Sequence, residues 1–391
     1  MRQMSKWMCG AALAAVLAGC ATVRVAAPPP DSGTPPPPAP NPHWSFEDAR
    51  AAGDRDGYRP PRKLAVLLPM SGELATAAGP VRDGLLAGYY AERRAKPELV
   101  FYDTAGTPSG AVAARDRAVA EGADQVLGPL GRDEVAALFN APQAVPLLAL
   151  NRALGSPPDN AAHFSLAPED EGEAAAAYLL ARNARQVLVL SNGDDHARRS
   201  VDSFRTRLEA GGGAIVGTLA ITGDQPGDQT PALRAAASRE GGIDAVLIAL
   251  RGTEARLMTP QLFASGLGQK LLVATSQLGS GTGKPDEDRA LDGIVFASET
   301  WATRGRASLP SPQTLAADLP TARGPAARLF AFGHDAWLLS GYLQHLADDP
   351  RASIEGATGR LSVGQDGSVV RTPAWATFRD GIVVPLPGGD G

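Results

Sequence analysis

Short apolar runs alternate with longer amphipathic stretches along most of the chain. The runs contain few polar residues, as expected of strands that are covered on both faces. The strands predicted by this pattern are 64–68, 99–102, 125–127, 145–150, 186–191, 214–221, 245–250, 270–274 and 293–297. The helices predicted between them are 79–96, 110–121, 134–140, 169–182, 197–210, 230–240 and 253–265. Strands separated by helices of this length predict an α/β protein with parallel sheets flanked by helices.

The C-terminal part of the chain has a different pattern. Residues 328–347 have apolar positions at helical spacing and predict one long amphipathic helix. Residues 359–371 predict a hairpin that turns near Asp366-Gly367, because Asp-Gly favours a tight two-residue turn. A last strand is predicted at 381–384.

The first twenty residues have the pattern of an export signal. Arg2 and Lys6 precede an apolar run over residues 7–17, which is too short for a permanent membrane span. The run ends in Leu17-Ala-Gly-Cys20, which resembles a bacterial lipobox. This resemblance implies a signal peptide over residues 1–19 and a palmitate-type acyl anchor on Cys20. The alternative is an ordinary signal peptide with a chance cysteine at this position.

A proline-rich segment follows the signal. Nine of the fifteen residues from Pro28 to Pro42 are proline, a composition that favours extended polyproline structure and cannot pack a core. We therefore interpret residues 20–61 as a lipidated tether, either of a length suited to reach or simply a spacer. Trp44 and Phe46 are predicted to dock on the folded part rather than to form a recognition segment.

Composition and charge exclude several functions. The net charge of −5 and the lack of a basic cluster argue against nucleic-acid binding. With Cys9 in the signal and Cys20 lipidated, no cysteine is left to form a disulfide. The five histidines lack metal-ligand spacing, and no Gly-x-Ser-x-Gly turn is present. The Gly279–Lys284 segment lacks the spacing of a phosphate loop. We therefore expect no enzyme activity, no metal and no cofactor.

Loops at the carboxyl ends of the predicted strands are the candidate ligand contacts. Such loops meet at one edge of a parallel sheet, and their free N–H groups at helix starts favour an anion. The candidates are Ser71, Gly72, Gly128, Pro129, Leu130, Asn151, Asp194, Arg251 and Ser276. For Asp194 we favour the simpler role of helix N-cap over contact with an ammonium group. The loop 69–79 is expected to line a cleft, with its helix starting near Gly79-Pro80.

An ordered set of segments resembles one known family. The segments are Leu67-Leu-Pro-Met-Ser-Gly72, Val81-Arg-Asp-Gly-Leu-Leu-Ala-Gly-Tyr-Tyr90, Tyr102-Asp-Thr104, Ala120-Glu-Gly-Ala-Asp-Gln-Val-Leu-Gly-Pro-Leu130, Val145-Pro-Leu-Leu-Ala-Leu-Asn151, Ser165-Leu-Ala-Pro-Glu-Asp-Glu171, Ala255-Arg-Leu-Met-Thr-Pro-Gln-Leu262 and Leu291-Asp-Gly293. The first is similar to the opening of branched-chain amino-acid receptors with a type I periplasmic-binding fold. Together they resemble the penicillin-binding-protein activator lipoproteins, the LppC/LpoA family.

This resemblance implies a fold, a location and a partner. The fold would have two lobes, with lobe 1 at residues 62–165 plus about 301–345, lobe 2 at 166–300, and a C-terminal hairpin and tail at 346–391. The protein would be an outer-membrane lipoprotein that faces the periplasm and activates a class A penicillin-binding protein by contact. Ala21 after the lipidated cysteine is consistent with that membrane. The alternative function is a lipid-anchored periplasmic receptor that delivers an amino-acid-like solute, held between the lobes, to a transporter.

Overall fold

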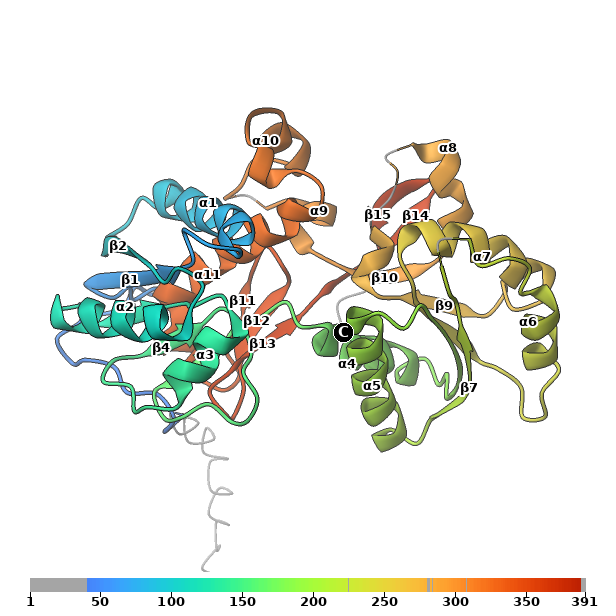
Figure 1. Ribbon diagram of the computed structural model, residues 1–391, viewed down its shortest axis with the longest axis horizontal. Helices are drawn as coiled ribbons and strands as arrows, with labels where there is room; N and C mark the ends of the chain where they lie inside the picture. The colour runs from blue at the N-terminus through green and yellow to red at the C-terminus, as the bar shows by residue number, and fades with distance from the viewer. Residues whose placement is uncertain (1–40, 224, 280–281, 283, 307, 388–391) are drawn as a thin grey trace, which may run out of the picture. The chain divides into compact units, whose positions relative to one another are not determined.

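The structure is a computed structural model, and it describes residues 41–387 apart from residues 224, 280, 281, 283 and 307. The predicted lipidation site Cys20 and residues 20–40 of the predicted tether lie outside the described residues. The described chain forms two lobes, each built on its own sheet with helices packed against it (Figure 1). The predicted two-lobed α/β class is confirmed.

Lobe 1 is built on a parallel sheet with the strand order β2-β1-β3-β4-β5. The strands are β1 (Lys63–Leu68), β2 (Glu98–Asp103), β3 (Gln125–Leu127), β4 (Leu147–Ala149) and β5 (Ala161–His163). The helices are α1 (Ala75–Ala91), α2 (Pro108–Ala120), α3 (Arg132–Phe139) and α11 (Pro325–Asp348). Side chains alternate along β1, so that Leu64, Val66 and Leu68 pack with α1 and α11. Ala65 and Leu67 pack with α2 and α3 on the opposite face.

Lobe 2 is built on a mixed sheet with the strand order β15-β14-β10-β9-β8-β6-β7. The strands are β6 (Gln186–Ser191), β7 (Ala214–Ala220), β8 (Ala245–Ala249), β9 (Leu271–Ala274), β10 (Val295–Ser298), β14 (Ala374–Arg379) and β15 (Ile382–Pro385). Its helices are α4 (Pro168–Leu180), α5 (Asp195–Ala210), α6 (Thr230–Ala237), α7 (Gly252–Ala264) and the short α8 (Pro285–Asp288). Strands β6 to β10 are parallel, whereas β14 and β15 join antiparallel.

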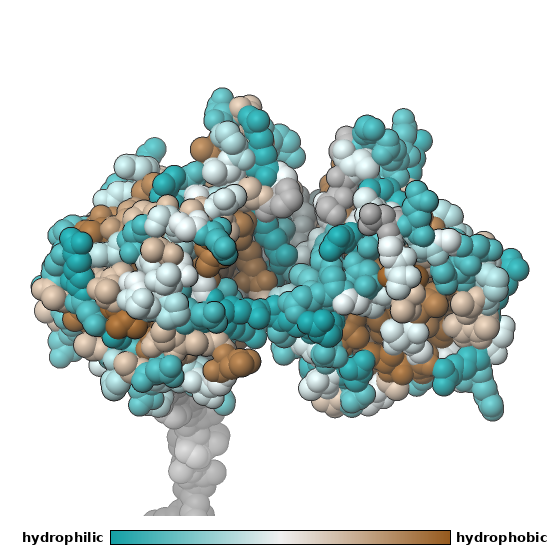
Figure 2. Space-filling view, in the orientation of Figure 1, coloured by the Kyte–Doolittle hydropathy of each residue, from teal (hydrophilic) through white to brown (hydrophobic). Residues whose placement is uncertain are grey.

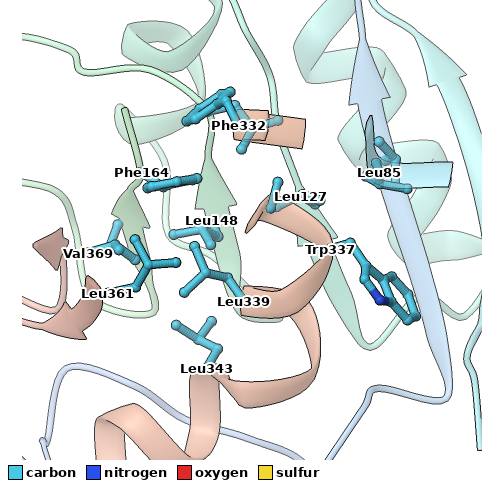
Figure 3. Close-up of a cluster of buried hydrophobic side chains, with 14 of the residues drawn as sticks. Leu85, Leu127, Leu148, Phe164, Phe332, Trp337, Leu339, Leu343, Leu361 and Val369 are labelled. Atoms are coloured by element: carbon cyan, nitrogen blue, oxygen red, sulfur yellow. The ribbon is translucent and has the colours of Figure 1, made fainter. Parts of the chain in front are cut away.

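A small third sheet packs against α11. It consists of β11 (Ile354–Glu355), β12 (Arg360–Val363) and β13 (Val369–Thr372). The predicted hairpin is confirmed, since β12 and β13 pair antiparallel around a turn that contains Gly367 at a positive φ of 79°. Figure 3 shows Leu361 and Val369 of this hairpin on one side of α11, with Leu339 and Leu343 directed toward them. The hairpin therefore completes the core of lobe 1.

The C-terminal part of the predicted tether, from residue 41 onward, is not a free tether but packs on lobe 1. Trp44 is buried, and its Nε1 donates to the Gly367 carbonyl at 3.1 Å. Arg50 forms an ion pair with Asp124 at 3.1 Å, and both side chains are almost fully buried. The expected docking of Trp44 and Phe46 is therefore confirmed. Residues 41–62 belong to the folded body, because their aromatic and ionic side chains have partners far along the chain.

The chain passes between the two sheets three times. The first passage lies between β5 and α4, the second between β10 and α11, and the third between β13 and β14. The second passage includes the short helices α9 (Thr300–Arg304) and α10 (Pro312–Asp318). Each lobe is consequently assembled from segments that are distant in the sequence.

Several predicted element bounds differ from the structure. Helix α1 starts at Ala75 instead of near Gly79, so Pro80 lies within it. The preceding Ala-Thr-Ala-Ala segment is favourable enough in a helix to add a turn. Strands β5 and β14 were not predicted. β5 is only three residues long, and β14 is defined by pairing with β10, from which it is far in sequence.

Helices α1 and α11 approach each other at glycines. A Cβ atom on Gly84 would lie 1.9 Å from the Phe330 carbonyl oxygen, and one on Gly333 would lie 1.9 Å from the Val81 carbonyl oxygen. These distances leave no room for a methyl group, so the two backbones must be in direct contact.

We expect Gly84→Ala to lower the free energy of unfolding by about 1–3 kcal/mol, because α1 must move away from α11. Urea unfolding monitored by tryptophan fluorescence would measure this. Gly53→Ala is the matched control, since the nearest atom to its Cβ would be 3.6 Å away. Equal stability of the two variants would contradict the close approach of the helices.

Candidate functional site

Three consecutive acidic residues begin α4, directly after the first passage between the lobes. They are Glu169, Asp170 and Glu171, and they follow Pro168 in the first turn of the helix. Carboxylates are favourable there because the N-terminal end of a helix carries partial positive charge. Each of the three forms an ion pair with an arginine from a different element. We call these three pairs the α4 ion cluster.

Glu171 is the most buried member of the α4 ion cluster, and its side chain has no exposed surface. Its Oε1 pairs with Arg328 of α11 and accepts from the Ser276 hydroxyl at 2.8 Å. Its Oε2 accepts from the Ser276 N–H at 2.9 Å and lies 3.6 Å from His196 Nε2. Burial opposes ionisation, but Arg328 and His196 outweigh it and hold the pKa of Glu171 below its usual range.

Arg328 connects two passages between the lobes. Its Nε lies 2.7 Å from Glu299, which follows β10 at the second passage, while its Nη2 pairs with Glu171 at the first. Its Nη1 donates to the Ser276 hydroxyl at 2.8 Å. Burial would lower the pKa of Arg328, but the charges of Glu171 and Glu299 raise it above its usual value. A charged arginine of lobe 1 is therefore held by two carboxylates outside its own helix.

Asp170 joins the loop after β4 to α4. Its Oδ1 pairs with Arg152 Nη2 at 2.5 Å, and Arg152 Nε donates to the Ser165 hydroxyl at 3.1 Å. Burial raises the pKa of Asp170 to about 6, and Arg152 offsets this effect only in part. This contact links lobe 1 to the start of lobe 2.

The third pair lies within lobe 2. Arg199 of α5 contacts both carboxylate oxygens of Glu169 at 2.8 Å, in the two-pronged geometry that arginine favours. Burial opposes ionisation of Glu169, but the Arg199 contacts hold its pKa below its usual range. This pair fastens α4 to α5 rather than one lobe to the other.

A cavity of about 190 Å³ lies beside the α4 ion cluster. It is lined by Leu130, Arg132, Leu150, Asn151, Ser165, Leu166, Ala167, Pro168, Arg199, Leu329 and Phe332. Most of the wall is apolar. Asn151 donates to the Leu130 carbonyl at 2.8 Å and accepts from the Arg152 N–H, while Ser165 and Arg199 are engaged in the contacts above. Several of the polar groups that a solute would need are therefore already hydrogen-bonded within the protein.

The predicted contacts Ser71 and Gly72 are not among the residues that line this cavity. The Asp103 carboxylate accepts from the N–H groups of Met70 and Ala105 at 2.9 and 2.8 Å, and from the Ser71 hydroxyl at 2.7 Å. Slight burial opposes ionisation of Asp103, but these hydrogen bonds lower its pKa. The loop after β1 thus already holds an anion, which is the protein's own side chain.

The other predicted contacts separate into four places. Leu130 and Asn151 line the cavity. Gly128 and Pro129 precede Leu130 in the loop after β3, where a Cβ atom on Gly128 would lie 2.1 Å from the Leu67 carbonyl oxygen of β1. Asp194 and Arg251 pair with each other at 3.0 Å in lobe 2. Ser276 instead belongs to the group around Glu171.

Asp194 has the capping role that the sequence favours. Its Oδ1 accepts from the Ala197 N–H at 2.8 Å and caps α5. Burial opposes ionisation of Asp194, but the Ala197 N–H and Arg251 hold its pKa below the usual value.

Sequence reasoning missed the three arginines of the α4 ion cluster. The acidic run after Pro168 is visible in the sequence, but at a helix start it is explained by the helix dipole alone. Arg152 and Arg328 are distant from it in the chain, and nothing in their surroundings marks them out. The run of three carboxylates in one turn is the signal that could have pointed to nearby cations, because like charges held close together are unfavourable unless opposite charges lie beside them.

The part of the chain that the structure describes has no candidate for a metal site or for a membrane-spanning helix. No group of three or more histidine, cysteine, aspartate or glutamate side chains could hold a metal ion there. None of the helices in that part is both long and apolar enough to cross a membrane.

The two lobes, the three passages between them and the parallel order of β1 to β5 define a type I periplasmic-binding fold. The sequence pattern of the periplasmic binding protein family matches residues 61–338, and the chain belongs to that family.

Of three similar proteins, two are named LpoA and the third has a different name. Penicillin-binding protein activator LpoA from Mannheimia succiniciproducens is 28% identical over 337 residues, which cover 83% of this chain and 55% of the relative. The LpoA C-domain from Haemophilus influenzae, described as a regulator of PBP1A, superposes with a TM-score of 0.70 at 23% identity, covering 83% of this chain and 99% of that one. A structure from Chromobacterium violaceum named as a candidate branched-chain amino acid ABC transporter has a TM-score of 0.62 at 27% identity, covering 81% and 99%.

The match is confined to part of the relatives. The chain spans about half the length of the curated relatives that it matches. In structure it corresponds to almost the whole H. influenzae C-domain but to 59% of the full-length protein.

We expect calorimetric titration with a broad panel of free amino acids to show no binding heat, because Met70 and Ser71 in the loop after β1 already donate to Asp103. Micromolar binding that Ser71→Ala weakens, while Ser156→Ala at another exposed serine leaves it unchanged, would contradict this.

Proposed function

We propose that this chain is a lipid-anchored outer-membrane protein that faces the periplasm and activates a class A penicillin-binding protein by direct contact. Its relatives carry the name of such an activator, and the likeness includes a C-domain described as a regulator of PBP1A. The protein would act without chemistry or a cofactor of its own. It would change the activity of the synthase through the surface that it presents.

This proposal is supported by the loop after β1, in which donor groups are already hydrogen-bonded to Asp103. In a fold that serves solute receptors, the free N–H groups of this loop would suit a carboxylate. Here Asp103 accepts from the N–H groups of Met70 and Ser71 and from the Ser71 hydroxyl. A protein whose loop is filled by its own side chain is better suited to contact with a partner than to capture of an amino acid.

The second candidate is a solute receptor. It is favoured by the cavity at the carboxyl ends of β3 and β4, which is where this fold class holds ligands, and by the likeness to the C. violaceum structure. The cavity, however, offers an amino acid an apolar wall and no carboxylate for its ammonium group among the lining residues. We therefore rank this candidate below the activator.

The anchor is the second part of the proposal. Leu17-Ala-Gly-Cys20 would direct cleavage and acylation of Cys20, and several acyl chains would give a stable attachment. Asn41 is already fastened to lobe 1, because its N–H donates to the Ala347 carbonyl at 2.9 Å. Residues 21–40 would thus be the tether, and twenty residues reach roughly 60 Å when fully extended.

We expect the immobilised protein to retain a class A penicillin-binding protein from solubilised membranes labelled with fluorescent penicillin. The retained band should disappear with heat-denatured protein and should persist in moderate salt if contact is specific. If no labelled protein is retained under any salt condition, the activator function is wrong and small-ligand screening by thermal shift becomes the next step.

We expect Cys20→Ser to move the protein from the membrane fraction to the soluble periplasmic fraction and to abolish incorporation of labelled palmitate, because the acylated side chain is lost. Cys9→Ser, which lies in the proposed signal peptide, is the control and should leave both unchanged. Membrane retention of Cys20→Ser would exclude the lipid anchor.

A further inference from the structure

Ionic groups lie at all three passages between the lobes. Asp170 and Glu171 follow the first passage, Glu299 lies in the second, and Arg371 is the penultimate residue of β13, just before the third. Arg328 of α11 contacts the first two. Figure 2 shows hydrophilic residues gathered along the segments that connect the two lobes. The connections of the chain and a group of ion pairs therefore share one structural location.

We propose that the ion pairs around Arg328 fix the two lobes against each other, so that a partner meets one pre-formed surface to which both lobes contribute. The role of a partner rests on the proposed function, whereas the fixed arrangement of the two lobes does not. A receptor that closes on a solute needs a hinge whose segments can change conformation. Here the corresponding segments are tied by charge.

Burial makes the contact between Arg328 and Glu171 costly to break. The Glu171 side chain has no exposed surface, so separating it from Arg328 would leave a desolvated carboxylate with only Ser276 and His196 as partners. Glu299 lies on another side of the same guanidinium. Without the arginine, two carboxylates would share one site and repel each other. Lobe 1 therefore cannot withdraw α11 without a large electrostatic penalty.

One further ion pair and one further positive charge act in the same direction. Arg152, which follows β4 of lobe 1, pairs with Asp170 of α4. Arg371 is 4% exposed, its Nη1 donates to the Thr358 carbonyl at 3.3 Å, and its positive charge favours the ionised forms of Asp170 and Glu171. The three acidic residues at the passages thus have three arginines close by, and the charges there balance.

The α4 ion cluster also provides an internal control. Arg199 pairs with Glu169 in the same helical turn, but both residues belong to lobe 2. Loss of Arg199 removes an arginine and an ion pair without removing an ion pair between the lobes. Arg328→Met and Arg199→Met differ in whether the broken pair joins the two lobes, and also in the carboxylate left behind, which is fully buried for Glu171 and 32% exposed for Glu169.

The test is a distance measurement between the lobes of the mature chain with Cys20 replaced by serine. Spin labels on Ser109→Cys in α2 and Glu209→Cys in α5, both exposed positions, report the separation by pulsed electron paramagnetic resonance. We expect one narrow distance distribution for the parent and for Arg199→Met. Arg328→Met should at least double the width of the distribution or add a second distance. A broad distribution in the parent, or an unchanged one in Arg328→Met, would overturn the proposal.

A second variant covers the case in which Arg328→Met does not fold. Glu171→Gln keeps a side chain that can accept from Ser276 but removes the charge that holds Arg328, so the distribution should again broaden. A narrow distribution in this folded variant would count against the proposal.

Capture of the labelled synthase separates this proposal from the function on which it partly rests. We expect Arg328→Met to retain at least tenfold less synthase than Arg199→Met. If the parent retains none, the activator function fails while the distance result still decides whether the lobes are fixed. If the distance distribution of Arg328→Met broadens but this variant captures the synthase as well as Arg199→Met does, the proposal of a pre-formed surface is wrong.

Discussion

A carboxylate without exposed surface must be neutralised or it will not remain ionised, and Glu171 imposes that requirement at the centre of this protein. The requirement is met by Arg328, which comes from a helix whose other side chains form the core of lobe 1. The position of α11 is therefore constrained from both sides. Its apolar face packs on the sheet of lobe 1, and its arginine is held by Glu171 and Glu299. The arrangement of the chain between the lobes depends on this one charged contact.

The close packing of α11 supports that contact. Glycines at the crossing of α1 and α11 allow the two backbones to touch, and Trp337 of α11 packs against Gly88 of α1. Leu339 lies on the side of α11 that faces the hairpin (Figure 3). A helix packed this tightly in lobe 1 cannot easily shift if lobe 2 moves. The site thus differs in character from a ligand pocket, whose polar groups are expected to be available to solute. Here Asn151, Ser165, Asp103 and Ser71 are already hydrogen-bonded within the protein.

Much of the fold could be predicted from local pattern. β6 has the bounds that the apolar run indicates, and the hairpin at Asp366-Gly367 follows from its turn residues. What could not be predicted depends on contacts between distant segments. β14 is a strand because it pairs with β10, and residues 41–62 are folded because Arg50 meets Asp124 and Trp44 meets Gly367. Proline content suggested a free tether there, but aromatic and ionic side chains with distant partners outweigh local composition.

The candidate site was less predictable than the fold for the same reason. Leu130 and Asn151 line the same cavity, and both follow strands whose carboxyl ends meet at one edge of the sheet. Ser71, which was predicted on the same grounds, instead donates its hydroxyl to Asp103. If the protein acts on a synthase by contact and needs no solute, titrating it into a purified class A penicillin-binding protein should raise the rate of glycan polymerisation. The rate should saturate near one molecule of this protein per synthase. A rate that stays constant at concentrations that saturate binding, or that rises only when a small ligand is added, would contradict this expectation.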